Sequence, residues 1–270
     1  MIHLTVPSSM KVFLWKEGAV MDRIRVFKIL SNEELADQIF KMVLAADETS
    51  WITRPGQFVN ITIENAYLKR PISISEWDEH SFTIIYKVVG VGTKQLSLKK
   101  PNEEIECLIQ LGNGFTPERL PSDHVLLIGG GVGVPPLVGC AKECLKLNKR
   151  VTVILGFDTA KRSFYIDKFK ALGCEVYVST NDGTLGVKGF VSDIMKEHKL
   201  CDIPYMACGP LPMLKAIYSI SRAKGQLSFE ERLGCGFGAC MGCSCKTISG
   251  VKRICKEGPV LDSEEILWKD

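Results

Sequence analysis

The fold class of this chain is decided by residues 124–137, HVLLIGGGVGVPPL. Residues 125–128 form a short, continuous apolar run, which is typical of a strand buried on both faces of a parallel sheet. A glycine turn then leads into a segment that begins with two prolines, as the first turn of a helix often does. Because the free N–H groups at a helix start attract phosphate, Gly130, Gly131 and Gly133 are candidates for binding a nucleotide.

Strand-like and helix-like segments alternate after this stretch. Apolar runs at residues 150–157, 174–180 and 202–209 predict strands, and helical patterns occupy residues 135–149, 163–173 and 210–225. The alternation predicts a doubly wound, parallel α/β nucleotide domain over residues 120–225. Cys208, Gly209 and Pro210 follow the last of these strands, at the edge where open sheets bind ligands, and are further nucleotide-binding candidates. A plain turn into the helix is the alternative for them.

The segment before residue 120 has a different pattern. Runs rich in β-branched residues lie at 23–30, 39–47, 57–63, 81–89 and 104–111, with turns between them. Such a succession predicts an antiparallel β-barrel over residues 21–115. Residues 1–20 lack this pattern and are interpreted as a leader, or as sequence ahead of the true start.

Two segments of the predicted barrel are candidates for holding a flavin. Residues 70–75 read RPISIS, in which the guanidinium of Arg70 can clamp a pyrophosphate and the hydroxyl of Ser73 can reach a ring nitrogen. Residues 85–93, IYKVVGVGT, end in a glycine turn whose N–H groups suit a phosphate cradle. Taken alone, Arg-Pro-x-Ser also suits an ordinary edge strand. Its position ahead of a nucleotide-type sheet favours the flavin.

Five of the eleven cysteines are concentrated in residues 231–259, ERLGCGFGACMGCSCKTISGVKRICKEGP. Cys235, Cys240 and Cys243 follow the pattern C-x4-C-x2-C, and Cys255 comes after eleven more residues, which is a ferredoxin-type spacing for a 2Fe-2S cluster. The intervening glycines bring backbone N–H groups close to the negatively charged cluster sulfurs. The spacing therefore predicts a small cluster domain over residues 226–270 with these four ligands. Cys245 is interpreted as a neighbour, although spacing alone does not exclude an exchange of ligands.

A structural zinc site is the main alternative for this loop. Such sites more often pair two short C-x2-C knuckles across a longer spacer, which is not the pattern here. The other six cysteines are scattered between residues 107 and 208 and do not form a disulfide framework. We expect most of them to be small buried residues in a reducing compartment.

Composition excludes several classes of function. The chain has 270 residues, 46% of them hydrophobic, which is enough for more than one domain core. Lys and Arg number 34 against 31 Asp and Glu, so there is no sustained basic stripe for nucleic acid. No apolar run is long enough for a signal peptide or a membrane span, and a soluble cytoplasmic protein is expected. No catalytic residue is predicted, because His3, His80, His124 and His198 lie in no evident catalytic motif.

Taken in order, Arg-Pro-x-Ser, GGGxGxPPL, Cys-Gly-Pro and the cysteine loop resemble the motifs of the ferredoxin-reductase-like superfamily. The loop LGCGFGACMGCSCKT with RICKEGPVL after it resembles the family of electron-transfer subunits of bacterial dihydroorotate dehydrogenase B. The resemblance covers nearly the whole chain from residue 23 onward. It implies an FAD-binding barrel, an NAD-binding α/β domain of ferredoxin-reductase type and a C-terminal 2Fe-2S domain with Cys235, Cys240, Cys243 and Cys255 as ligands. The FAD contacts that it implies are Arg70, Pro71, Ile72, Ser73, Ile85, Tyr86, Lys87, Gly92 and Thr93.

In that family, electrons leave dihydroorotate at an FMN held by a separate catalytic subunit. They cross the cluster and the FAD and reduce NAD, as a step of pyrimidine (UMP) biosynthesis. The resemblance therefore implies an oxidoreductase subunit that does not oxidise dihydroorotate by itself and that assembles with the FMN subunit, two copies of each. Phe237 and Met241 in the cysteine loop suit such an interface, with local packing as the alternative.

Other functions stay open at this point. A subunit of an NADPH:ferredoxin oxidoreductase would share the barrel, the sheet and the cluster. A zinc-stabilised binding module would keep the fold without redox chemistry, and a self-sufficient diaphorase would need no partner. The choice between NAD and NADP is open too, because Asp158 carries a charge opposite to that of Lys161 and Arg162.

Overall fold

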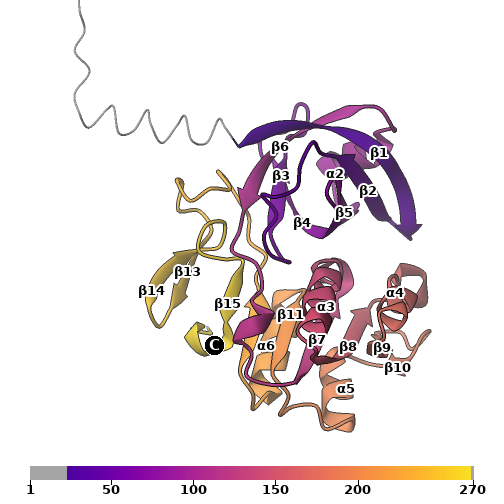
Figure 1. The fold of residues 1–270 in the computed structure, drawn as a ribbon, viewed down its shortest axis with the longest axis vertical. Helices are drawn as coiled ribbons and strands as arrows, with labels where there is room; N and C mark the ends of the chain where they lie inside the picture. Colours follow the sequence, from indigo (N-terminus) through magenta and orange to yellow (C-terminus); the bar gives the residue numbers. More distant parts are fainter. Residues whose placement is uncertain (1–22, 269–270) are drawn as a thin grey trace, which may run out of the picture.

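The computed structural model describes residues 23–268 of the chain, so the leader expected at residues 1–20 lies outside the described residues. Three parts follow one another along the chain and pack together: a barrel, an α/β sheet and a cysteine-rich segment beside both (Figure 1). The predicted fold class is confirmed. Within the described range, no helix is long and apolar enough to cross a membrane.

The first part is a closed antiparallel barrel with the strand order β1-β2-β5-β4-β3-β6. Its strands are β1 (Ile24–Ala36), β2 (Ile39–Ala45), β3 (Phe58–Ile61), β4 (Arg70–Trp77), β5 (Ser81–Lys87) and β6 (Glu104–Leu111), with helix α2 (Val91–Leu98) after β5. The segment beginning RPISIS is thus a full strand of the barrel. The glycine turn continues into α2, a helix that the sequence pattern did not predict. Closure leaves no unpaired strand edge.

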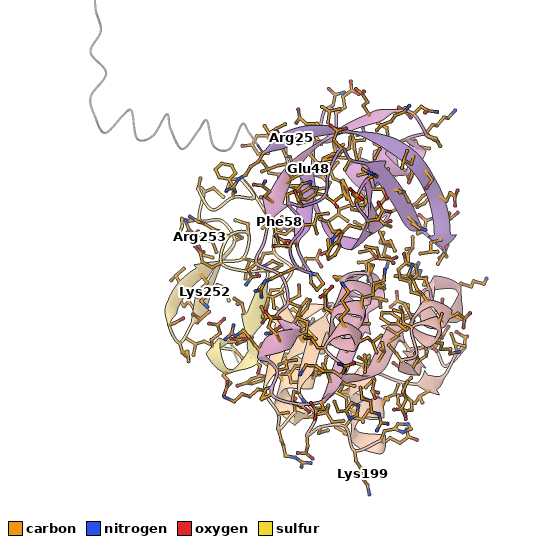
Figure 2. All side chains as sticks on the ribbon, viewed as in Figure 1. Arg25, Glu48, Phe58, Lys199, Lys252 and Arg253 are labelled. Carbon is orange, nitrogen blue, oxygen red and sulfur yellow. The ribbon has the colours of Figure 1, made fainter. Side chains whose placement is uncertain are left out.

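Strand β3 shows how the barrel faces the rest of the molecule. Val59 and Ile61 point into the barrel core, and each contributes about 1.5–3 kcal/mol by its burial. Because side chains alternate along a strand, Phe58 and Asn60 lie on the outer face, and both are buried there. Phe58 packs into a core shared with the sheet and the cysteine-rich segment, and it lies where the three parts meet (Figure 2). The outer face of β3 is therefore an interface between parts.

The second part is a seven-stranded sheet with the order β10-β9-β8-β7-β11-β12-β15, parallel except for β15. Its strands are β7 (His124–Gly130), β8 (Arg150–Phe157), β9 (Glu175–Thr180), β10 (Val187–Lys188), β11 (Tyr205–Cys208), β12 (Gly225–Ser228) and β15 (Val260–Asp262). The helices are α3 (Pro136–Lys146), α4 (Ile166–Ala171), α5 (Val191–Glu197) and α6 (Leu211–Ile220), with short 3-10 helices η1 (Pro117–Arg119), η2 (Gly131–Gly133), η3 (Ala160–Arg162) and η4 (Ser263–Glu265). Helices α3 and α4 cover one face, and α5 and α6 cover the other.

Several elements of this part depart from the sequence patterns. The helix expected over residues 210–225 ends at Ile220, and its last residue opens strand β12. Helix α5 and strands β12 and β15 were not predicted. β12 has four residues and β15 has three, which is too short for a periodic signal, and each exists because it pairs with a strand distant in sequence.

The third part contains a hairpin, β13 (Ser244–Thr247) and β14 (Gly250–Arg253), and the cysteine loop before it. Most of this part has no regular structure, so contacts with the other parts position it. Leu233, Cys243, Ile254 and Cys255 share one buried cluster with Phe58 and with the sheet.

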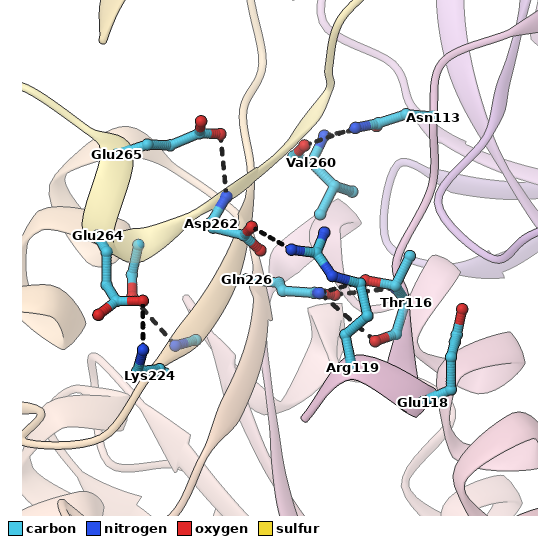
Figure 3. A network of polar contacts seen from close by, with 12 residues as sticks. Asn113, Thr116, Glu118, Arg119, Lys224, Gln226, Val260, Asp262, Glu264 and Glu265 are labelled. Atoms are coloured by element: carbon cyan, nitrogen blue, oxygen red, sulfur yellow. Dashed lines mark hydrogen bonds and ion pairs between the residues drawn. The ribbon is translucent and has the colours of Figure 1, made fainter. Parts of the chain in front are cut away.

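The link between barrel and sheet holds the C-terminal strand in place (Figure 3). The side-chain amide of Asn113 donates to the carbonyls of Glu257 (3.1 Å) and Val260 (2.7 Å) and accepts from the N–H of Val260 (3.1 Å). Three residues on, the N–H of Thr116 donates to Oε1 of Gln226 (2.9 Å) in β12. One short linker therefore fixes β12, the edge strand β15 and the segment that follows Cys255.

The barrel and the sheet are also joined directly. The hydroxyl of Ser75 donates to the carbonyl of Pro135 (3.2 Å) at the start of α3. Next to it, the carboxylate of Glu76 lies 2.8 Å from Lys142 and 2.5 Å from Lys168. Burial disfavours the ionised form of this carboxyl group and so raises its pKa. The two ammonium groups outweigh that effect and hold the pKa of Glu76 below its ordinary value. The two parts thus meet through satisfied polar groups.

Replacing Asn113 tests the role of the linker. We expect Asn113→Ala to lower the free energy of unfolding by about 1–2 kcal/mol, because it leaves buried groups of Val260 without a partner. The matched control is Arg119→Ala, which removes the exposed ion pair with Asp262 (3.1 Å) at the same junction and is expected to cost less than about 1 kcal/mol. Denaturant titration measures both, and equal losses would contradict the assigned role of Asn113.

Candidate functional site

A single cleft of about 1430 Å³ lies between the barrel, the sheet and the cysteine-rich part. All fifteen residues that the sequence suggested for FAD or NAD line it. They are Arg70, Pro71, Ile72, Ser73, Ile85, Tyr86, Lys87, Gly92, Thr93, Gly130, Gly131, Gly133, Cys208, Gly209 and Pro210. The structure thus brings four separate segments of sequence to one surface.

The two nucleotide-type motifs of the sheet touch each other. Cys208 at the end of β11 pairs with Gly129 at the end of β7. A Cβ atom placed on Gly133 would lie only 2.2 Å from the carbonyl oxygen of Cys208, and one on Gly130 would lie 2.5 Å from Sδ of Met213. The clash at Gly133 is with backbone atoms, so only glycine fits there, and the turn and the Cys-Gly-Pro segment form one closely packed wall of the cleft.

On the barrel side, Arg70 lies across the start of helix α2. A Cβ atom on Gly92 would lie 2.8 Å from Nε of Arg70, so the guanidinium occupies the space that any larger residue would need. Arg70 also donates to the carbonyl of Leu68. A fixed guanidinium beside a helix start offers two kinds of donor to a diphosphate, which is the group that FAD would present here.

Two of the candidates use their hydroxyl groups within the protein. The hydroxyl of Tyr86 donates to Oδ1 of Asn32 (2.8 Å), and burial raises the pKa of Tyr86. Oγ1 of Thr93 accepts from the N–H of Val89 (2.9 Å) and shapes the turn before α2. These residues line the cleft, and their hydroxyl groups also hold Asn32 and the glycine turn in place.

The predicted cluster cysteines form two pairs. The N–H groups of Ala239 and Cys240 donate to Sγ of Cys235 (3.2 and 3.4 Å), and the N–H of Cys235 donates to Sγ of Cys240 (3.5 Å). Cys243 and Cys255 form the second pair, in which the N–H of Cys255 donates to Sγ of Cys243 (3.4 Å). Two pairs of thiols with backbone donors fit a 2Fe-2S cluster, in which four cysteines are shared between two irons.

The two pairs differ in their surroundings. Cys240 is exposed, whereas Cys243 and Cys255 are buried. Burial disfavours the thiolate of Cys235, but the N–H donors of Cys240, Phe237 and Ala239 outweigh burial and lower its pKa to about 6. Within residues 23–268, no three Cys, His, Asp or Glu side chains converge tightly enough for a single metal ion.

Arg253 links the cysteine loop to the segment that follows it. Arg253 donates to the carbonyl of Gly238 (2.6 Å) and through Nε to the carboxylate of Glu257 (2.9 Å). The guanidinium lowers the pKa of Glu257 to about 2. Arg253 thereby connects the cysteine loop to the segment after Cys255.

The remaining predictions in this region have mixed outcomes. Cys245 lies in β13, where its thiol donates to the carbonyl of Lys246 (3.6 Å). Met241 is 50% exposed, while Phe237 packs against the shared core, so local packing describes Phe237 better than an interface does. The scattered cysteines 107, 140, 144, 174 and 201 are buried, as expected for small apolar residues.

The cleft also contains residues that the sequence analysis did not assign to a binding site. Phe229, Leu233, Ile254 and Pro259 line it from the cysteine-rich part. Ile254 directly precedes Cys255, so the cleft reaches the cluster loop. Leu233, Ile254 and Pro259 belong to the quoted cysteine-loop motifs, but those motifs gave no reason to expect these side chains on the cleft.

Polar residues at the mouth of the cleft bear on nucleotide choice. Arg162 forms ion pairs with Asp158 (3.0 Å) and with Asp37 of the barrel (3.2 Å). Asp158 and Arg162 line the cleft, but Lys161 does not, and neither does any described histidine. The charge of Arg162 is therefore already balanced by two carboxylates.

The fold and the cysteine loop define an oxidoreductase of the ferredoxin-reductase type with an added iron-sulfur domain. Residues 127–219 match the family described as the oxidoreductase NAD-binding domain, and residues 230–267 match the iron-sulfur cluster binding domain of dihydroorotate dehydrogenase B. Curated relatives named dihydroorotate dehydrogenase B (NAD(+)), electron transfer subunit, are 41% identical in Bacillus velezensis and 42% identical in Bacillus pumilus, each over 88% of this chain and 96% of the relative. The chain belongs to this family of electron-transfer subunits.

Solved structures agree on the fold. One described as an NADH-dependent reduced ferredoxin-NADP oxidoreductase has a TM-score of 0.81 and 29% identity, over 90% of each chain. A ferredoxin NADP+ reductase from Neisseria gonorrhoeae has a TM-score of 0.64 and 15% identity, over 73% of this chain and 90% of that one. The second similarity concerns the fold alone.

Replacing Gly92 tests the barrel side of the cleft. A methyl group at Gly92 must displace the guanidinium of Arg70, so we expect Gly92→Ala to weaken FAD binding roughly tenfold, about the loss of one charged hydrogen bond. Gly90→Ala is the matched control, because no heavy atom lies within 4 Å of its added methyl group. Flavin content after dialysis and fluorescence titration measure the effect. Equal FAD affinity in the two variants would contradict this role of Arg70.

The cysteine loop gives a second test. We expect Cys240→Ala to abolish iron binding and the cluster absorbance while FAD stays bound, because the flavin side of the cleft lies on the barrel. Cys245→Ala should keep the cluster. Iron analysis and visible spectra measure the cluster content of both variants. Loss of the cluster in Cys245→Ala and its retention in Cys240→Ala would reverse the ligand assignment.

Proposed function

We propose that this chain receives electrons from a partner subunit that oxidises dihydroorotate and delivers them through a 2Fe-2S cluster and an FAD to NAD, in pyrimidine biosynthesis. The observation that carries the proposal is the continuity of the cleft. It runs from Arg70 on the barrel, past Gly133 and Cys208 on the sheet, to Ile254 beside the cluster ligand Cys255. Sites for three redox groups thus adjoin one another.

The chemistry requires all three groups. Nicotinamide exchanges two electrons as hydride, a 2Fe-2S cluster exchanges one, and a bound flavin exchanges either number. The protein has to hold and orient them, and we assign Arg70 and the start of α2 to the FAD diphosphate and the glycine turn at Gly131 to the NAD diphosphate. Residues 21–115, 120–225 and 226–270 are the three units proposed to carry FAD, NAD and the cluster.

We further assign NAD, and not NADP, as the nucleotide. A 2′-phosphate would meet the carboxylate of Asp158 in the cleft, and the guanidinium of Arg162 that would have to bind it is already paired with Asp158 and Asp37. An unphosphorylated ribose carries no such charge and can be accepted by a carboxylate such as Asp158.

The cluster loop also presents a surface for the partner. Cys240 is exposed at its rim, next to Met241, and Ile248, Val251 and Leu267 are exposed apolar residues of the same part. Exposed apolar side chains on the part that carries the cysteine loop suit the docking of an FMN-containing dihydroorotate dehydrogenase subunit. Two copies of each subunit in a cytoplasmic complex is the assembly that we propose.

A second candidate is a subunit of an NADPH:ferredoxin oxidoreductase. The observation that favours it is the structural match at a TM-score of 0.81. Two observations oppose it. The sequence identity to the dihydroorotate dehydrogenase B subunits is higher, 41% compared with 29%, and the charge of Arg162 is already paired with carboxylates.

Reconstitution distinguishes the two. The holoprotein is mixed anaerobically with an FMN-containing dihydroorotate dehydrogenase subunit, dihydroorotate and either NAD or NADP. We expect NADH to form only with both proteins present, and Cys240→Ala to block this transfer while NADH still reduces the FAD. Reduction of NADP by reduced ferredoxin, without any transfer from dihydroorotate, would reject the proposal in favour of the second candidate.

A further inference from the structure

A buried amide on the barrel has no hydrogen-bond partner. Asn60 in β3 is fully buried, and neither its Nδ2 nor its Oδ1 has a partner within residues 23–268. It pairs in the sheet with Pro71 on one side and Leu108 on the other. Burying an amide without a hydrogen-bond partner costs about 1–3 kcal/mol. An apolar residue of the same size would therefore make the chain without cofactors more stable.

The amide faces the cysteine loop. A Cβ atom on Gly236 would lie 2.6 Å from Nδ2 of Asn60, and Gly236 directly follows the cluster ligand Cys235. Gly236 also has a positive φ of 80°, which glycine adopts at no steric cost. Glycine is therefore required at position 236 by its positive φ and also by the close approach of the Asn60 amide.

The cysteine loop is the neighbour that the Asn60 amide reaches. Phe58 and Pro71 line the cleft and Asn60 does not, so the amide is not part of the cleft surface assigned to FAD and NAD. The N–H donors found on the cysteine sulfurs come from the loop itself. Asn60 is a donor from a different part of the molecule, on the side of the loop that packs against the barrel.

We propose that Asn60 donates a hydrogen bond to the iron-sulfur centre at its Cys235 side and thereby raises the reduction potential of that centre. The proposal rests on the proposed function only in requiring the cluster. Sulfur atoms of such a centre carry more negative charge in the reduced state, so an N–H donor stabilises the reduced state more than the oxidised one. The barrel then tunes the centre as well as holding the flavin.

The test is a potentiometric titration of the cluster, followed by EPR, in the holoprotein and two variants. Asn60→Leu keeps the size and removes the amide, and Asn60→Asp keeps the shape but replaces the N–H donor by an oxygen. In both we expect the ratio of reduced to oxidised cluster at a fixed potential to fall about tenfold, or about 59 mV for one electron. The EPR g-values should shift, while iron content and the flavin potential stay the same.

Thr62→Val is the matched control. Thr62 lies two residues further along the chain and its hydroxyl donates to Glu106 (2.6 Å), so its loss should leave the cluster potential unchanged. If a cluster-loaded Asn60 variant keeps the cluster potential of the wild type, the inference about Asn60 is wrong and the proposed function is unaffected. A wild-type chain that binds no iron would overturn the proposed function together with it.

Discussion

The docking of the C-terminal segment against both other parts is the constraint on which the rest of the structure depends. The cysteine-rich part has one short hairpin and little other regular structure, so it has no fixed position of its own. Strand β15 pairs with β12 at the edge of the sheet, and Asn113 in the linker holds the residues between Cys255 and β15. These contacts place the cluster loop at the end of the cleft.

Close backbone contact gives the cleft its shape. Gly133 touches the carbonyl of Cys208, and Gly92 leaves room for Arg70. In both places a larger residue would push apart two segments that the fold brings together at the cleft. The protein supplies positions and charges here, because the reactive chemistry of such enzymes belongs to the cofactors.

The barrel has two interfaces, and they differ in whether a buried polar side chain has a hydrogen-bond or ion-pair partner. Where the barrel meets the sheet, the carboxylate of Glu76 has two ammonium partners, so this contact is complete within the chain. Where the barrel meets the cysteine loop, the amide of Asn60 has none among the described residues. The first interface fixes the two parts of the cleft, and the second leaves a donor directed at the loop that carries the predicted cluster cysteines. A polar group retained in such a position is better explained by a function than by stability.

Local features of the fold could be predicted from the amino-acid sequence. The buried strand and glycine turn at residues 124–137 predicted the α/β sheet, the strand patterns predicted the barrel, and the cysteine spacing predicted the cluster loop, because each signal lies within a few neighbouring residues. The tertiary structure alone decided which segments meet. Strands β12 and β15, the contact of Gly133 with Cys208, and the placing of Ile254 and Asn60 depend on pairing and packing between residues far apart in the chain, which leave no periodic or compositional trace in the sequence.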